Sequence, residues 1–231
     1  MAHTANRTTN GFELIGNLMN VPDNGRDYEL TPSTAFVKGD MVVLTAGKVA
    51  KAAANAANVL GVMAESIAAA DNPSTSVTYG KVYDNPFNLY RCSFADQVDS
   101  TATSGTTTTL VDTALSTSND DYWNGALLYV YAGTNAGCVR TVTDYTGSSD
   151  TLAFVAMPAA CDTTTKYIIL GAAGSGDVIN VGSVGIDLKD ENTIDANATV
   201  GSEAGPLAAL KIDPANLMMD VIIRKHRYNG I

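Results

Sequence analysis

The feature that most constrains this chain of 231 residues is the regular interruption of its apolar runs. Between residues 31 and 95, short runs rich in Val, Leu, Tyr and Ala are broken by Gly, Pro, Asn or Asp. The breaks recur about every 8 to 12 residues, which is typical of β-sandwiches and β-barrels. Residues 50–58 have strong helix propensity, but they are too few for a long helix. The sequence therefore predicts an all-β fold.

The stretch from 96 to 172 differs in composition from the sequence on either side. It begins with a threonine-rich segment and carries eight aspartates but only two basic residues, Arg140 and Lys166. Its second half contains three apolar runs separated by the turn sequences GTNAG and TGSSD. After a glycine-rich joint, the style of residues 31–95 resumes. We therefore predict a small β-sandwich-like subdomain, residues 96–172, inserted into a discontinuous β-barrel base formed by residues 31–95 and 173–231.

Residues 1–30 are polar and rich in turn signals, with one short apolar cluster. This segment is too short to fold alone, and two interpretations stay open. It is either an extended arm that docks on a neighbouring subunit or a segment that packs on its own domain. In the first interpretation the anchoring side chains are Phe12, Leu14, Ile15, Leu18 and Met19.

The formal net charge of −10 argues against nucleic-acid or anionic-membrane binding through a basic face. The basic run 224–227 is the exception, and we interpret it as a solvated strand end. The sequence contains no run of about 18 apolar residues, and its first residues lack the layout of a signal peptide. We therefore expect a soluble protein that is made in the cytoplasm.

The three cysteines, Cys92, Cys138 and Cys161, are widely spaced, and none belongs to a CxxC pair. Their odd number favours buried free thiols in a reducing compartment. A bridge between Cys138 and Cys161 remains an alternative.

The reactive residues form no pattern that is typical of an active site. His3 and His226 lie far apart, and neither has a metal-ligand partner at a suitable spacing. The acidic stretch 187–195 lacks the central glycine of an EF-hand loop, and the glycine-rich stretch 171–177 lacks the Lys-Ser/Thr ending of a phosphate loop. We expect no catalytic residue, no metal and no cofactor, and hence a protein that is not an enzyme.

Aromatic residues gather in the predicted insert, where Tyr122, Trp123 and Tyr145 could form an exposed patch that stacks on sugars. Tyr129 and Tyr131 share one face of their strand because side chains alternate along it. The same residues are equally what a small sandwich uses to fill its core. Both interpretations stay open.

Two sets of motifs carry a family resemblance. The stretches FVKGDMVVLTAGKVAKA, VLGVMAES and GSEAGPLAAL resemble capsid decoration (cement) proteins of tailed bacteriophages, over residues 31–95 and 177–227. The stretch DDYWNGALLYVYAGTNAGCVRTVTDYTGSSDTLAF is similar to a small β module of phage head and tail appendages.

The resemblance implies a β-barrel or β-tulip-like base on the outer capsid surface, commonly as a homotrimer, that contacts the major capsid protein. The expected function is that of a structural virion protein, which decorates and stabilises the capsid by bridging its major subunits. The alternative is a receptor- or glycan-binding appendage, such as a head fibre or tail component. An acidic chain fits the outside of a DNA-filled shell.

Overall fold

The structure, a computed structural model, describes residues 11–54, 56–95, 98–170, 184–186, 188, 190–195, 205–213, 216 and 218–227. These residues form strands, loops and two short 3-10 turns, Ala69–Asp71 and Gly147–Ser149, with no α-helix among them. The all-β prediction is confirmed. No helix within the described ranges is long and apolar enough to span a bilayer.

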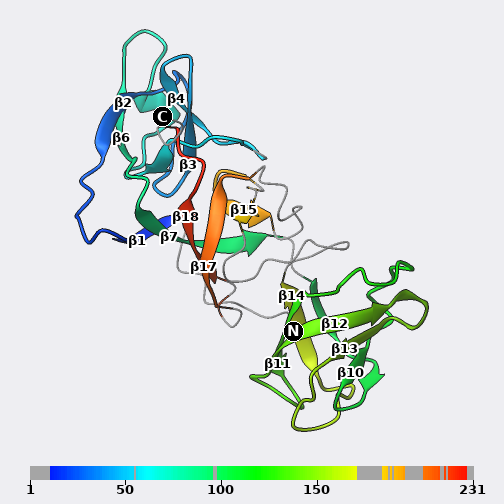
Figure 1. Cartoon of the computed structure of the whole chain (residues 1–231). Coiled ribbons are helices and arrows are strands. Elements are labelled where there is room, and N and C mark those ends of the chain that lie inside the picture. The colour runs from blue at the N-terminus through cyan, green and yellow to red at the C-terminus, as the bar shows by residue number, and fades with distance from the viewer. Residues whose placement is uncertain are drawn as a thin grey trace.

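The strands form three sheets, which follow one another along the molecule (Figure 1). The first is a five-stranded sheet near one end, and its strands come from residues 26–83. Its order is β2 (Arg26–Glu29), β6 (Tyr79–Tyr83), β5 (Gly61–Met63), β3 (Met41–Thr45) and β4 (Lys48–Lys51).

This five-stranded sheet curls into a half-barrel. A parallel bridge between Leu30 and Val49 brings its first and last strands together, and the Thr31 N–H donates to the Val49 carbonyl at 2.8 Å. Alternate side chains therefore point into an enclosed interior. The buried residues of this interior are Leu30, Phe36, Val42, Val49, Leu60, Met63 and Val82.

The second sheet, in the middle of Figure 1, joins strands from both ends of the sequence. Its order is β1 (Glu13–Asn17), β7 (Asn88–Ala95), β18 (Met218–Ile223), β17 (Leu207–Asp213) and β15 (Val184–Ile186). Strand β16 (Thr193–Asp195) pairs with β7 in parallel, whereas β18 pairs with β7 antiparallel. The chain segments before and after residues 98–170 thus meet in one sheet.

The third sheet contains seven strands that all come from residues 98–170. Its order is β8 (Val98–Thr101), β14 (Lys166–Leu170), β11 (Leu127–Ala132), β12 (Val139–Thr146), β13 (Thr151–Phe154), β10 (Thr109–Val111) and β9 (Ser104–Gly105). Among the described strands, these seven pair only with one another.

The seven-stranded sheet closes on itself because its two end strands, β8 and β9, are nearly continuous in the chain. The Ala102 N–H donates to the Thr165 carbonyl on one side, and the Thr103 N–H donates to the Val111 carbonyl on the other. Strand β12 passes from one layer of the closed sheet to the other: its first half pairs with β11 and its second half pairs with β13. A register shift between Val142 and Asp144 marks the bend. Corner strands of this kind join the two layers of a sandwich.

A buried carboxylate organises one side of this closed sheet. Asp112 is 2% exposed and accepts hydrogen bonds from the Ser100 hydroxyl at 2.5 Å, the Tyr167 hydroxyl at 2.6 Å and the Ala114 N–H at 2.9 Å. Burial, together with the bond to Asp112, raises the pKa of Tyr167, so the phenol stays protonated as a donor. These bonds satisfy the carboxylate inside an apolar core.

The described part of the N-terminal segment packs on its own domain. Strand β1 pairs with β7, and β2 pairs with β6. Phe12 is 2% exposed, and its N–H donates to the Gly39 carbonyl at 2.8 Å. Residues 11–30 therefore follow the second of the two interpretations, while residues 1–10 lie outside the described part of the chain.

Burial decides the outcome at the basic run 224–227 and at the three cysteines. The predicted solvated strand end at 224–227 is wrong for His226, which is 3% exposed and bridges Val59. The cysteines are free thiols: Cys92 and Cys161 are buried, and Cys138 is half-buried. The structure therefore has no disulfide between Cys138 and Cys161, which was the alternative.

Candidate interaction surface

Five apolar side chains lie exposed where the loop after β1 meets the loop between β6 and β7. The exposed fraction is 54% for Leu18, 62% for Met19 and 53% for Val21. Phe87, on the other loop, is 49% exposed, and its carbonyl accepts the Leu18 N–H at 2.9 Å. Ile15, at 36%, adds to the group from β1. We call these five residues the loop surface.

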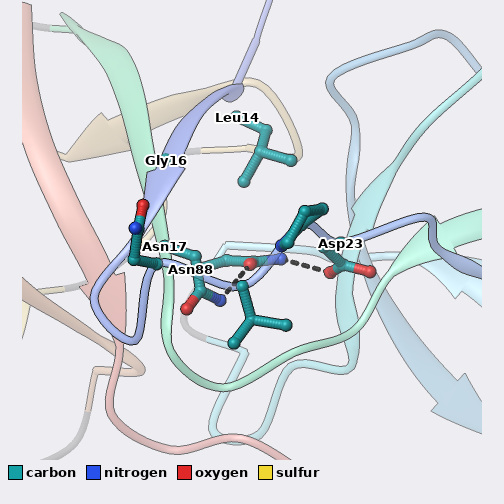
Figure 2. A pocket seen from close by; sticks show the side chains of 8 residues that line it. Leu14, Gly16, Asn17, Asp23 and Asn88 are labelled. Carbon is teal, nitrogen blue, oxygen red and sulfur yellow. Dashed lines mark hydrogen bonds between the residues drawn. The ribbon is translucent and has the colours of Figure 1, made fainter.

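Two hollows open beside the loop surface. The first, of about 310 Å³, is lined by residues that include Leu14, Gly16, Asn17, Asp23 and Asn88 (Figure 2). The second, of about 540 Å³, is lined by residues that include Asp84, Phe87 and His226. Pro22 and Asp23 line both hollows, so the two openings adjoin at these residues.

The side chain of Asp23 is held in place by a strand residue and by its own turn. Its Oδ2 accepts the Asn88 amide at 2.5 Å, and its Oδ1 accepts the Gly25 N–H at 2.8 Å. Asn88 is fully buried and in turn accepts the Asn17 amide at 2.9 Å, as Figure 2 shows. The local sequence favours this arrangement, because an aspartate before Asn-Gly readily accepts the N–H two residues later.

The two carboxylates of the hollows differ in their partners. Asp84 accepts the Tyr28 hydroxyl at 2.5 Å and lies 3.4 Å from the Arg26 guanidinium. Asp23 has no cationic side chain within ion-pair distance among the described residues. Burial lowers the pKa of His226 below its ordinary value of 6.5, so this imidazole is neutral near pH 7. Arg26 also lines the second hollow, but its guanidinium pairs with Asp84. Asp23 therefore presents a negative charge that no ion pair compensates among the described residues.

The five anchors predicted from the sequence divide into three groups. Ile15, Leu18 and Met19 are exposed on the loop surface. Leu14 is half-buried, packs against the core of its own domain and lines the first hollow. The prediction is wrong for Phe12, whose side chain fills the core of its own domain and is not available to a partner.

Sequence reasoning missed two members of the loop surface, Val21 and Phe87. Both are apolar residues inside turn sequences, next to Pro22 and Pro86 respectively. An apolar side chain next to a turn proline lies where the chain reverses at the surface. That position was the available signal.

The predicted exposed aromatic patch is wrong. Tyr145 is 1% exposed and Trp123 is 8% exposed, and both belong to the core of the closed seven-stranded sheet. Tyr122 is half-buried and packs edge-on against Trp123, with ring centroids 4.9 Å apart. Burial and the hydrogen bond to Asp150 raise the pKa of Tyr145 to about 12. These rings supply packing, which was the alternative interpretation.

Tyr129 and Tyr131 share one face of β11, as the alternation predicts. That face is opposite to the interior of the closed sheet, which takes Leu128 and Val130. Both tyrosines pack instead against the large cluster that includes the second sheet. The Tyr131 hydroxyl donates to Asp99 at 2.8 Å.

Within the described part of the chain, no group of three or more His, Cys, Asp or Glu side chains could hold a metal ion. Part of the acidic stretch 187–195 lies outside that part. In the rest, the Asp190 carboxylate accepts the backbone N–H groups of Asn192 and Thr193, as in an ordinary turn.

Comparison with models of protein families, with curated proteins and with solved structures gives no match to this chain. The loop surface and its two hollows are therefore interpreted on their own chemistry. They combine exposed apolar side chains with one carboxylate, Asp23, that has no ion-pair partner among the described residues.

Proposed function

We propose that this chain is a structural virion protein that decorates the outer surface of a tailed-phage capsid and stabilises it by bridging major capsid subunits. The resemblance of the strand motifs to decoration proteins suggests this function. The observation that carries it is the loop surface, five exposed apolar side chains on one region of a β-sheet base. Grouped exposed apolar side chains are typical of protein contact sites.

The loop surface suits binding because its backbone is held before a partner arrives. The Leu18 N–H is bonded to the Phe87 carbonyl, and Asp23 is bonded to Asn88. Fully burying one such apolar side chain stabilises by about 1.5 to 3 kcal/mol. Four of the five side chains, Leu18, Met19, Val21 and Phe87, are about half exposed. Burying their exposed parts contributes on the order of 5 kcal/mol before the entropy of association is subtracted. Many copies of the contact on a symmetric lattice together stabilise the capsid, even when each copy keeps only a small favourable free energy of binding.

Charge supports an outside position. The net charge of −10 is repelled by packaged DNA, and so the chain is better placed on the outer face of a shell. The family resemblance adds a homotrimer to the proposal, and sedimentation of the purified chain tests that part. The appendage alternative is less well supported, because two of the three aromatic residues expected to bind a sugar, Trp123 and Tyr145, are buried.

The test adds purified chain to capsids that lack it and measures capsid survival under heat and osmotic shock. We expect the chain to bind and to raise survival. The double variant Leu18→Asp, Phe87→Asp is expected to bind weakly, because two charges would be buried at the contact. The matched control is Val155→Asp, which alters a 70% exposed valine of the seven-stranded sheet region. Capsids that survive equally with and without bound chain contradict the stabilising function.

A further inference from the structure

The uncompensated carboxylate of Asp23 lies between the two hollows and next to the loop surface. It accepts bonds from Asn88 and Gly25, and at 3.4 Å from the Asn85 N–H. A carboxylate offers about four lone-pair sites, so Asp23 retains capacity for a further donor. In a chain of net charge −10, the donor that complements this position is cationic.

The neighbouring strand indicates the shape of the partner. β1 is the first strand of the six-stranded sheet, and its outer edge has no strand partner among the described residues. Gly16 has open space where a Cβ would lie, and Ile15 is exposed beside it. An unpaired, partly apolar edge accepts an extended chain through backbone hydrogen bonds.

Resting on the proposed function, we infer that the loop surface and the edge of β1 bind an extended segment of a partner polypeptide that carries a lysine or arginine beside apolar residues. The basic side chain enters the hollows and pairs with Asp23. The apolar residues cover Leu18, Met19 and Val21. A sugar is a poorer fit, because Phe87 is the only aromatic ring of the loop surface. An anionic membrane is repelled by the net charge.

The experiment screens the full chain against a yeast-displayed library of random 12-residue peptides. We expect the enriched peptides to share one Lys or Arg flanked by apolar residues. Asp23→Asn keeps the shape of the side chain and an acceptor for Asn88, but removes the charge. It is expected to weaken binding about tenfold and to abolish the preference for a basic residue. The exposed carboxylate of Asp27 supplies the control, and Asp27→Asn is expected to change binding less than about twofold.

A second variant guards against a folding defect in Asp23→Asn. Met19→Asp alters a side chain that is 62% exposed, so the fold is retained while peptide binding is lost. Three outcomes overturn the inference: no enriched peptides, enriched peptides without a basic residue, or binding that is unchanged in either Asp23→Asn or Met19→Asp.

Capsid binding separates this inference from the function on which it rests. If capsids bind the chain but neither Asp23→Asn nor the enriched peptides reduce that binding, the inference fails and the decorating function stands. If the peptides bind as expected but capsids do not bind, the proposed function fails and the peptide site stands.

Discussion

Arg91 on β7 and Asp220 on β18 form a two-point ion pair across the middle sheet. The Arg91 Nε lies 2.7 Å from the Asp220 Oδ1, and Nη2 lies 3.0 Å from Oδ2. The two residues are register partners on strands that lie before and after residues 98–170. The Asp220 side chain is only 10% exposed. The pair therefore fastens together two chain segments that are far apart in the sequence.

Removing the cation from this pair is expected to destabilise the protein. Arg91→Met leaves the Asp220 carboxylate nearly buried without its charged partner, which costs about 2 kcal/mol. Lys81→Met serves as the control, because Lys81 and Asp27 form an exposed pair at 3.8 Å that contributes little. Urea unfolding measures both. Equal losses in the two variants would contradict the special role of the Arg91 pair.

Truncation is expected to cost much more stability at Phe12 than at Met19, although the two residues lie only seven positions apart. Phe12→Ala opens a cavity in the core and is expected to lower the free energy of unfolding by about 3 to 5 kcal/mol. Met19→Ala changes an exposed side chain and is expected to alter it by less than about 0.5 kcal/mol. Thermal unfolding compares the two, and a stable Phe12→Ala variant would argue that residue 12 is not in the core.

His226 is expected to make stability depend on pH near neutrality. Burial lowers the pKa of the folded His226 below 6.5, the value expected in the unfolded chain. Between the two pKa values the unfolded state binds more protons. The stability that the neutral His226 imidazole contributes is therefore fully present above about pH 6.5. It is lost as the pH drops through that value towards the folded pKa.

The measurement is the free energy of unfolding at pH values between about 7.5 and 5.5, where the imidazole of an unfolded chain titrates. His226→Gln is expected to flatten the slope, whatever its effect on absolute stability. An unchanged slope in this variant would show that other groups are responsible.

Gly133 and Gly137 provide a matched comparison within one loop. Both have positive φ angles, +76° and +89°, at which an L side chain is strained. A Cβ at Gly133 would also lie 1.8 Å from the Thr164 carbonyl oxygen, whereas a Cβ at Gly137 meets nothing within 4 Å.

Gly137→Ala is expected to cost about 1 kcal/mol for the backbone conformation alone. Gly133→Ala adds a backbone clash and is expected to cost at least about 2 kcal/mol more than Gly137→Ala. Denaturant unfolding of both variants checks the difference. Equal costs would mean that the loop moves away freely from Thr164.

Several elements could be predicted from the sequence because their signals are local. The turn sequence GTNAG lies between β11 and β12, and TGSSD runs from the last residue of β12 to the residue before β13. Glycine and asparagine in such turns adopt backbone angles that other residues avoid. The candidate surface was found in part for a similar reason, since three of its five residues form an apolar cluster within a turn-rich segment.

Other features could not be predicted because alternation distinguishes the two faces of a strand without saying what covers each. Tyr129 and Tyr131 share a face, but only the packing of β11 shows that this face is outside the closed sheet. Tyr145 and Phe12 are as apolar as an exposed contact residue, yet neighbouring strands cover them.

The sequence by itself determined the all-β character, the spacing of strands and turns, and the strong negative charge, because each depends on residues close together in the chain or on composition alone. Only the tertiary structure decided that β7 pairs with β18, that the seven-stranded sheet closes through β8 and β9, and that Asp23 lies beside Phe87 and Asn88. These contacts join residues distant in the chain, and their free energy depends on which surfaces are buried together.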